Sequence, residues 1–325
     1  MLSGGLDSIL AIKIVQEQGI EVSAVHFVTP FASTDRNNSS AEAARVAING
    51  MGVVIREIFL TDAYLDMIIN PRHGYGKNMN PCADCHILMC REAKKVMEEI
   101  EAQFVVTGEV VGQRPMSQNR NTLRLVEKES GLQGLLLRPL SAQLLPPTIP
   151  EKEGWLDREM LMSFSGRIRR PQIELAESYG IGGYPSPAGG CLLTAKEFSR
   201  KVKDLLDYNA MSMHDVELLK VGRHFRLNAE TKLIVGRDKR ENQRIEELAQ
   251  ASDYIFRPTK ANGPSALLRG KYDAEKTTLA AEIVARYCDG NEATYDIVFR
   301  LQSSGKSEIL TVKPKRNTML SELRI

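Results

Sequence analysis

Hydrophobic and polar positions alternate with two different periods along the first two thirds of the chain. Short apolar runs rich in β-branched residues predict buried strands at residues 21–27, 53–59, 104–107 and 135–140. Apolar residues at helical spacing predict helices at residues 9–15, 40–49, 62–69, 82–101, 154–164, 172–179 and 196–206. Strands that alternate with helices are typical of parallel sheets, so we expect residues 1–205 to form an α/β domain with a doubly wound parallel sheet.

The pattern changes near residues 208–212, and the elements that follow come in a different order. Strands are predicted at residues 224–227, 232–235, 294–301 and 308–312, and helices at 243–251 and 275–287. This order indicates a second, smaller domain of the α+β class, residues 206–325.

Composition and charge narrow the class of protein. The chain has 325 residues, of which 42% are hydrophobic and 26% are charged, as expected of a globular protein with two domains. Its net charge of +2 does not by itself indicate a nucleic-acid partner, so a basic RNA-binding face must be local. The sequence has no apolar run of 18 residues and no signal peptide, which predicts a cytoplasmic protein without a membrane partner. Five cysteines in such a protein are more often ligands or catalysts than disulfides.

A glycine-rich loop directly before the first helix is the clearest candidate site, and its residues are Ser3, Gly4, Gly5, Leu6, Asp7 and Ser8. Adjacent glycines let a backbone approach a ligand closely, and the free N–H groups at a helix start bind phosphate. No Gly-Lys-Ser/Thr follows, so the loop is not a Walker A motif. A buried strand normally precedes such a loop, whereas only Met1 and Leu2 do here, so we expect either a start codon assigned too late or a truncated first strand.

Two predicted strands end in residues suited to contacts with a nucleotide. Ligands of doubly wound sheets bind beside the carboxyl ends of the strands. His26 and Phe27 end one strand and would line an adenine pocket, although a structural role for the histidine is equally compatible with its position. Thr107 and Gly108 end another strand and would form a second nucleotide-contacting loop.

Three cysteines form a candidate reactive group. Cys82 and Cys85 make a Cys-x-x-Cys pair at a helix start, a pattern that zinc sites, redox pairs and iron–sulfur sites all use. Cys191 lies in a loop with two prolines and two glycines, which favours chemistry over packing. We expect Cys90 to be a core residue, because five helical steps turn it away from Cys85, and the solitary Cys288 to be structural.

Basic residues cluster in two places where they would contact RNA phosphates. The two groups are Arg167, Arg169 and Arg170, and Arg237, Lys239 and Arg240. Acidic residues nearby nearly balance both groups, so an ordinary charged surface is an equal alternative.

The motif SGGLDS resembles the pyrophosphate (PP) loop of the N-type ATP pyrophosphatases. With NPCADCH at residues 80–86 and TGEVVGQRPMSQ at residues 107–118, it resembles the tRNA thiouridine synthetases of that superfamily, in particular the 4-thiouridine synthetases, with the 2-thiouridylases as close relatives. The stretch LIVGRDKRENQRIEELA at residues 233–249 resembles the small RNA-binding domain of NFACT-class ribosome-rescue factors.

This resemblance implies an adenine nucleotide α-hydrolase-like fold and an ATP-dependent tRNA sulfurtransferase. In such enzymes ATP adenylates a uracil carbonyl oxygen, and sulfide then displaces AMP. The loop and the two strand ends would bind ATP, and Asp7 would hold Mg²⁺. Asp7, Cys82, Cys85 and Cys191 would be the catalytic residues, with tRNA and ATP as partners.

The sequence contains no rhodanese domain, so the obvious persulfide donor of the longer 4-thiouridine synthetases is missing. It also contains no added RNA-binding module ahead of the loop. With three cysteines it resembles the iron–sulfur-dependent thiolases, in which Cys82, Cys85 and Cys191 would hold a [4Fe-4S] cluster with one open iron for inorganic sulfide. The alternative is a persulfide on Cys191, supplied by a cysteine-desulfurase-type donor and resolved by Cys85 or Cys82.

Two further interpretations stay open: an ATP pyrophosphatase that acts on a small metabolite, and a non-enzymatic RNA-binding protein with a structural zinc. A homodimer is also left open.

Overall fold

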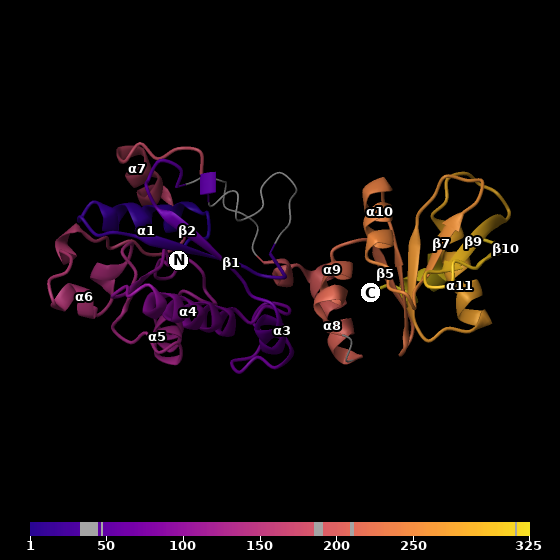
Figure 1. Ribbon diagram of the computed structural model, residues 1–325, viewed down its shortest axis with the longest axis horizontal. Coiled ribbons are helices and arrows are strands. Elements are labelled where there is room, and N and C mark those ends of the chain that lie inside the picture. The colour runs from indigo at the N-terminus through magenta and orange to yellow at the C-terminus, as the bar shows by residue number, and fades with distance from the viewer. Residues whose placement is uncertain (33–44, 47, 185–190, 209–210, 316) are drawn as a thin grey trace. The chain divides into compact units, whose positions relative to one another are not determined.

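The computed structural model describes residues 1–32, 45–46, 48–184, 191–208, 211–315 and 317–325, which form two compact units, Met1–Thr194 and Ala195–Ile325 (Figure 1). No described helix is both long enough and apolar enough to cross a membrane.

The first unit is a mixed α/β structure. Its strands are β1 (Ser23–Val28), β2 (Val54–Phe59), β3 (Val105–Val106) and β4 (Leu136–Leu137), and its helices are α1 (Leu6–Gln16), α3 (Asp62–Ile69), α4 (Cys82–Glu99), α5 (Arg120–Glu129), α6 (Ile149–Lys152) and α7 (Arg170–Ser178). β1 pairs with β2 and β3 pairs with β4, both in the parallel sense. The first two residues link these pairs, because the Met1 ammonium donates to the Val106 carbonyl at 2.6 Å and the Leu2 N–H to the Val25 carbonyl at 2.8 Å.

Helix α1 lies in the core of the first unit, and its sequence explains why. Leu6, Leu10 and Ile14 pack into one hydrophobic cluster, whereas Ile9 and Ile12 pack into another. A helix that is apolar on several faces is buried, so the loop that precedes it is held in a fixed position inside the unit.

Two sequence predictions for this unit need correction. The helix predicted at residues 154–164 is wrong: α6 ends at Lys152, Gly154 adopts a left-handed φ of 69°, and only a 3₁₀ turn at Arg158–Met160 follows. Helix α5 was not predicted, and its start is capped because the Asn119 side chain accepts from the Thr122 N–H at 2.9 Å. Most of the helix predicted at residues 40–49 lies outside the described residues.

The second unit is built on one antiparallel sheet of six strands, in the order β10-β9-β7-β8-β6-β5. The strands are β5 (Arg223–Asn228), β6 (Thr231–Val235), β7 (Tyr254–Pro258), β8 (Ala266–Gly270), β9 (Tyr295–Leu301) and β10 (Ser307–Val312). The sequence analysis missed β7 and β8. Residues of α11 (Ala274–Arg286) pack on one face of this sheet, and α9 (Met213–Leu219) and α10 (Lys239–Glu247) pack on the other, while α12 spans Asn317–Leu323.

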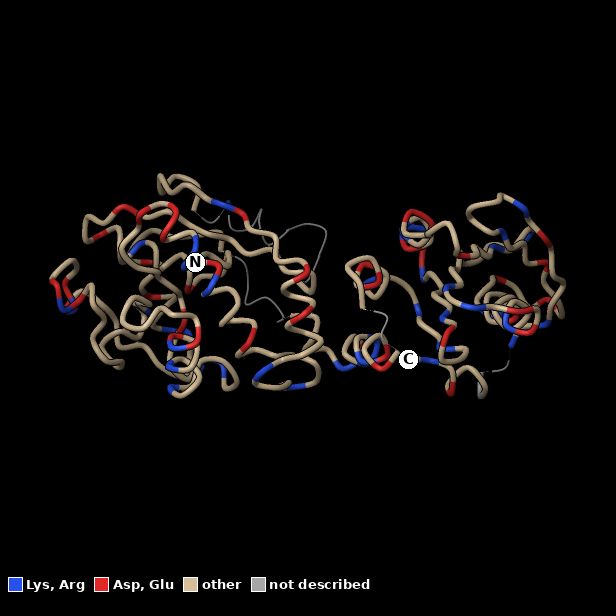
Figure 2. Tube along the Cα trace, turned by 60° about the horizontal axis from the view of Figure 1, so that its bottom comes forward, with Lys and Arg blue, Asp and Glu red and all other residues tan. Residues whose placement is uncertain are grey.

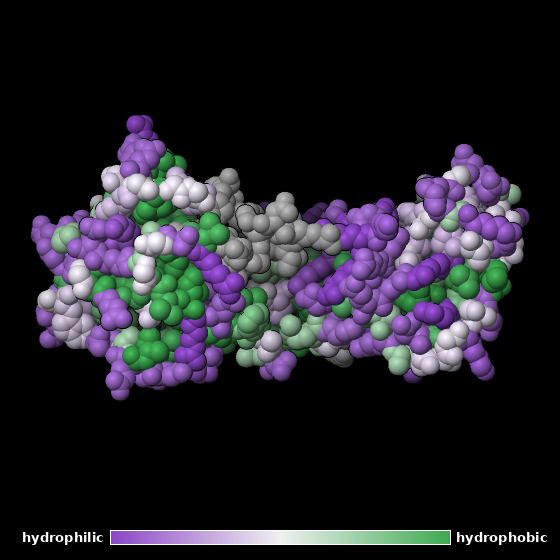
Figure 3. All heavy atoms as spheres, turned by 45° about the horizontal axis from the view of Figure 1, so that its top comes forward, coloured by the Kyte–Doolittle hydropathy of each residue, from purple (hydrophilic) through white to green (hydrophobic). Residues whose placement is uncertain are grey.

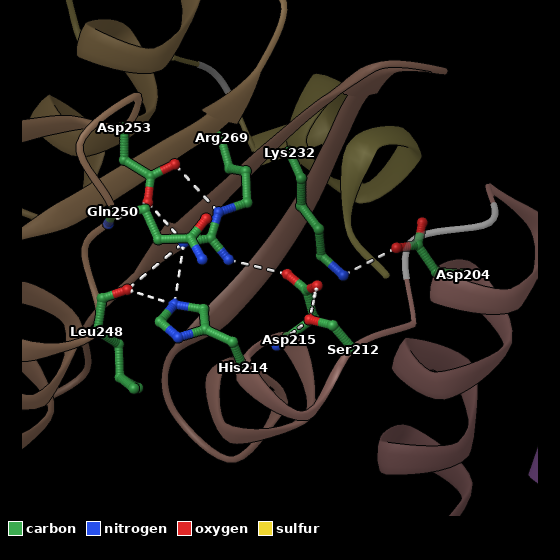
Figure 4. A network of polar contacts seen from close by, with 9 residues as sticks. All are labelled: Asp204, Ser212, His214, Asp215, Lys232, Leu248, Gln250, Asp253 and Arg269. Carbon is green, nitrogen blue, oxygen red and sulfur yellow. Dashed lines mark hydrogen bonds and ion pairs between the residues drawn. The ribbon is translucent and has the colours of Figure 1, made fainter. Parts of the chain in front are cut away.

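Helix α8 (Lys196–Asp207), which the sequence analysis assigns to the first domain, begins the second unit. Ion pairs hold α8 and α9 to the sheet, as Figure 4 shows. The Lys232 ammonium of β6 lies 2.8 Å from the Asp204 carboxylate of α8. The Arg269 guanidinium of β8 lies 2.8 Å from Asp215 of α9 and also donates to Asp253 at 3.0 Å.

Candidate nucleotide and thiol site

The loop at residues 3–8 is tightly closed on itself. Gly4 has a φ of 77°, a left-handed conformation that favours glycine. The Ser8 hydroxyl donates to the Gly5 carbonyl at 2.8 Å, and the Ser3 N–H donates to the Ser8 hydroxyl oxygen at 3.2 Å. Since the loop runs directly into α1, it joins a compact turn to the positive end of a helix dipole, which is the arrangement that binds phosphate.

The second predicted nucleotide loop lies directly against the first. A Cβ atom on Gly108 would stand 2.5 Å from the Asp7 carbonyl carbon and oxygen and from the Ser8 nitrogen. No side chain fits at that distance, so the absence of one at Gly108 lets the two backbones meet. Thr107 precedes it, with its N–H bound to the Leu137 carbonyl at 3.0 Å. The structure therefore brings together the two segments that the sequence selected separately.

Asp7 faces polar side chains that come from later segments of the chain. The Gln113 side-chain amide donates to one Asp7 carboxylate oxygen at 2.7 Å, and the Gln172 amide donates to the Gln113 side-chain oxygen at 3.3 Å. The Arg169 guanidinium lies 3.8 Å from the other Asp7 oxygen. The sequence analysis did not select Gln113 or Gln172, although Gln113 lies inside the TGEVVGQRPMSQ motif.

His26 and Phe27 contribute to the packing around the loop. His26 is only 2% exposed, and its Nδ1 atom lies 2.9 Å from the Leu2 carbonyl, so it fixes the residue directly before the loop. Phe27 packs against the core cluster that contains Ile87 and Cys90. The described contacts of these two residues are structural, and their predicted contact with adenine stays a prediction.

The three candidate cysteines lie on two segments of the first unit. Cys82 and Cys85 lie in the first turn of α4, and the Cys85 sulfur lies 3.3 Å from the Tyr64 hydroxyl. Cys191 precedes a 3₁₀ turn at Leu192–Thr194, and its sulfur lies 3.7 Å from the Phe31 carbonyl. The Phe31 and Tyr64 rings are in contact, with centroids 6.1 Å apart, so Cys191 and Cys85 share one aromatic-walled region.

All three thiols resist ionisation. Burial is the main cause and raises the pKa of Cys85 to about 12, that of Cys191 to about 11, and that of Cys82 by a smaller amount. Neighbouring thiols also raise the pKa values: Cys191 and Cys82 raise the pKa of Cys85, and Cys82 raises the pKa of Cys191. The three thiols are therefore neutral at pH 7.

Sulfur donors suit soft metals and iron–sulfur clusters, but their arrangement here does not form a ready metal site. Among the described residues, no group of three His, Cys, Asp or Glu side chains lies close enough together to hold a metal ion. The [4Fe-4S] cluster therefore stays a prediction, as does the Mg²⁺ ion at Asp7.

A buried carboxylate lies beside the thiol-bearing helix. Glu109 accepts from the Arg138 guanidinium at 2.9 Å and from the Thr107 hydroxyl at 3.1 Å, and its other oxygen lies 2.9 Å from Nδ1 of His86. Burial alone would raise the pKa of Glu109, but Arg138 and His86 outweigh it and lower that pKa to about 2. Cys90 is 2% exposed in the core beside this network, which confirms its predicted packing role.

The predicted RNA-contacting residues have different surroundings. Arg167 and Arg170 are exposed, and Arg170 pairs with Glu174 at 2.7 Å, whereas Arg169 turns toward Asp7.

In the second unit Arg237 is held by Glu241, with its Nε 2.9 Å from that carboxylate, and Lys239 and Arg240 are exposed in the first turn of α10. Figure 2 shows basic and acidic positions interleaved along the chain in both units, so neither cluster forms a large region of one sign.

Comparison with known proteins gives two family matches. Residues 1–143 match the sequence model described as thiamine biosynthesis protein (ThiI), and residues 222–324 match the NFACT protein RNA binding domain.

Individual relatives match limited lengths of the chain. A probable tRNA sulfurtransferase of Staphylococcus saprophyticus is 31% identical over 196 residues, which are 56% of this chain and 46% of that protein. One from Lysinibacillus sphaericus is 27% identical, over 43% of this chain and 33% of that protein. The tRNA-specific 2-thiouridylase MnmA of Nitratidesulfovibrio vulgaris is 34% identical over 27% of each chain. The chain thus spans less than half the length of each of these relatives.

Among solved structures, the C-terminal part of the fibronectin/fibrinogen-binding protein of Streptococcus suis is similar, with a TM-score of 0.29 and 12% identity over 75% of this chain and 89% of that one. The family matches identify the two parts of the protein: the chain joins a domain of the ThiI family to an NFACT-type RNA-binding domain.

Proposed function

We propose that this chain is an ATP-dependent sulfurtransferase that thiolates a uridine of tRNA. The observation that carries the proposal is that Cys85 and Cys191 lie beside the contacting Tyr64 and Phe31 in the same unit as the phosphate-type loop. The relatives are named as tRNA sulfurtransferases and 2-thiouridylases, and the NFACT-type domain supplies a means of holding RNA. A tRNA substrate would place the reaction in the cytoplasm.

The first step would activate a uracil carbonyl. The carbonyl oxygen attacks the α-phosphate of ATP and pyrophosphate leaves, which converts a poor leaving group into AMP. The loop N–H groups would neutralise the pyrophosphate, and Asp7 has an oxygen available to hold Mg²⁺ directly or through water. We favour 4-thiouridine as the product because of the TGEVVGQRPMSQ motif, and 2-thiouridine is the alternative.

The second step would bring in sulfur through the cysteines. A [4Fe-4S] cluster, where bound, would supply an open iron for hydrosulfide; the thiols as they stand form no three-ligand site, so we assign no step to it. Without a cluster, the terminal sulfur of a Cys191 persulfide attacks the activated carbon and AMP leaves. The Cys85 or Cys82 thiol then attacks the Cys191 sulfur, which releases thiouridine and leaves a disulfide that an external dithiol must reduce.

The test is a thiolation assay with tRNA and ATP, read by nucleoside mass spectrometry. We expect Cys82→Ala, Cys85→Ala and Cys191→Ala to lose thiolation, whereas Cys90→Ala and Cys288→Ala retain it. Assays with iron-free protein and sulfide, and with a cysteine desulfurase, separate the two sulfur routes: activity only after iron–sulfur reconstitution indicates the cluster, and a sulfur adduct on Cys191 indicates the persulfide. Absence of thiouridine under every condition would reject the function.

A further inference from the structure

We propose that Arg169 binds the β- and γ-phosphates of ATP and holds the departing pyrophosphate, with Gln113 and Gln172 as the polar wall beside it. This inference rests on the proposed function only in taking ATP as the nucleotide. It separates Arg169 from Arg167 and Arg170, with which the sequence groups it.

The backbone delivers Arg169 to the loop by a specific contact. The Gly166 N–H donates to the Val111 carbonyl at 2.8 Å, so the segment that precedes α7 runs beside the segment that carries Gln113. Helix α7 packs against α1, the helix that follows the phosphate-type loop. Arg169 is the N-cap residue of α7, and Gln172 lies in the first turn of that helix. Two helix starts and one guanidinium therefore lie around Asp7.

The polar atoms here are buried and incompletely satisfied. One Asp7 carboxylate oxygen, Nε of Arg169 and the Gln172 side-chain oxygen are shielded from solvent and have no hydrogen-bond partner among the described residues. Gln172 is 1% exposed. An unpaired buried donor or acceptor costs about 1–3 kcal/mol, so a cluster of them indicates a site that a polar ligand completes.

The spacing of the charges points to the same ligand. Arg169 and Asp7 are 3.8 Å apart, too far for the two-pronged hydrogen bond that an arginine makes with a carboxylate. Both groups thus keep their capacity for a further partner of opposite sign. A Mg²⁺–triphosphate supplies a partner for each group: the cation binds the Asp7 carboxylate, and the phosphate oxygens accept from the guanidinium.

The assignment gives Arg169 a part in adenylation. As the uracil oxygen bonds to the α-phosphorus, the bond from that phosphorus to the bridging oxygen of the β-phosphate breaks, and its electron pair leaves with pyrophosphate. The charge that develops on this oxygen is stabilised by a cation already in place. Arg169 remains protonated throughout, since a guanidinium does not release its proton at neutral pH.

The experiment compares nucleotide affinities of the full chain in the absence of tRNA, with a non-hydrolysable ATP analogue and with AMP as probes. Arg169→Ala should weaken binding of the analogue by about 10- to 100-fold, as expected for loss of charged hydrogen bonds, and leave AMP binding unchanged because AMP lacks the β- and γ-phosphates. Arg169→Lys should give an intermediate loss, because it keeps the charge but not the fork. Arg170→Ala, at an exposed side chain, should not change either nucleotide affinity.

Unchanged analogue affinity in Arg169→Ala overturns this inference, as does a loss shared equally by AMP. Loss of tRNA affinity alone in Arg169→Ala would also overturn it, and would return Arg169 to the RNA-contacting group. If the wild-type chain binds the analogue through Arg169 but never thiolates tRNA, the proposed function fails and the inference stands. If the wild-type chain binds no nucleotide, both fail.

Discussion

Two groups of buried polar residues, one in each unit, differ in how completely their hydrogen bonds are satisfied. In the second unit, Asp204, Lys232, Asp253 and Arg269 all have oppositely charged partners within the unit (Figure 4). In the first unit, Asp7, Arg169 and Gln172 each keep one buried atom without a hydrogen-bond partner among the described residues. The comparison teaches that one set of charges stabilises a fold, whereas the other is arranged for something that binds.

The surfaces differ as well. Most of the large hydrophobic side chains exposed in the described chain belong to the first unit, and Figure 3 shows larger hydrophobic areas on that unit than on the second. On the face that Figure 3 shows, the second unit is the more polar of the two.

The largest effect should come from filling the contact between the two loops of the first unit. In Gly108→Ala a Cβ meets the Asp7 backbone at 2.5 Å, so the loop must move. We expect the rate of pyrophosphate release to fall at least about 100-fold, since a shift near 1 Å in a site costs that much. Gly182→Ala is the matched control, because a Cβ there meets no described atom within 4 Å. Equal rates in the two variants would show that the loops need not touch.

Breaking the paired network of the second unit should affect stability and leave nucleotide binding intact. Arg269→Met leaves the Asp253 carboxylate, which is fully buried, without its charged partner. Loss of one partner from a buried pair costs about 3–5 kcal/mol. Thermal unfolding followed by calorimetry should show an earlier transition for the second unit, with ATP-analogue affinity unchanged. A variant as stable as the wild type would mean that the pair contributes little to the fold.

The stability of the second unit should depend on pH through the buried Lys201 ammonium. Lys201 donates to the Leu219 and Gly222 carbonyls at 3.1 Å, and burial, helped by nearby Arg237 and Lys232, lowers its pKa to about 8. The unfolded chain keeps this proton up to a pKa near 10.5, so it binds more protons than the folded chain between these values. The free energy of unfolding of the second unit should therefore rise by about 3 kcal/mol from pH 8 to 10.5.

Lys201→Met should abolish this rise, and Lys203→Met, at an exposed position, should preserve it. Chemical denaturation at a series of pH values measures the effect. A rise that survives in Lys201→Met would have to come from another group.

Much of the fold could be predicted because local patterns are strong. The boundaries of α3 were predicted as observed at Asp62–Ile69, and those of β2 within one residue, since the apolar pattern of each segment is local. β7 and β8 were missed because Pro258, Gly263 and the following proline look like loop residues. Their strand character depends on pairing with distant strands, which no local pattern records.

Part of the candidate site could likewise be predicted from local sequence motifs, and part could not. The loop with Asp7 and the turn at Gly108 each have a local glycine motif, so the sequence identified both. Arg169 lies near Asp7, and Gln172 near Gln113, because their segment contacts Val111, more than fifty residues earlier in the chain, and because α7 packs against α1. Sequence alone shows three similar arginines, and only the fold distinguishes the half-buried one from its exposed neighbours.

The smallest expected effect concerns RNA affinity at α10. Lys239 and Arg240 are exposed at the start of this helix, where the dipole disfavours cations, so their position does not help the helix. Contacts with RNA phosphates would explain why two cations lie at this helix start. In the full chain, Lys239→Ala with Arg240→Ala should weaken tRNA binding less than about 100-fold and reduce the slope of log affinity against log salt by about one to two, close to one per lost contact. Lys271→Ala is the control, because Glu230 already pairs with that exposed cation at 2.6 Å. An unchanged salt slope in the double variant would assign RNA binding to another face of the second unit and would leave its charges, like those of its interior, paired only among themselves.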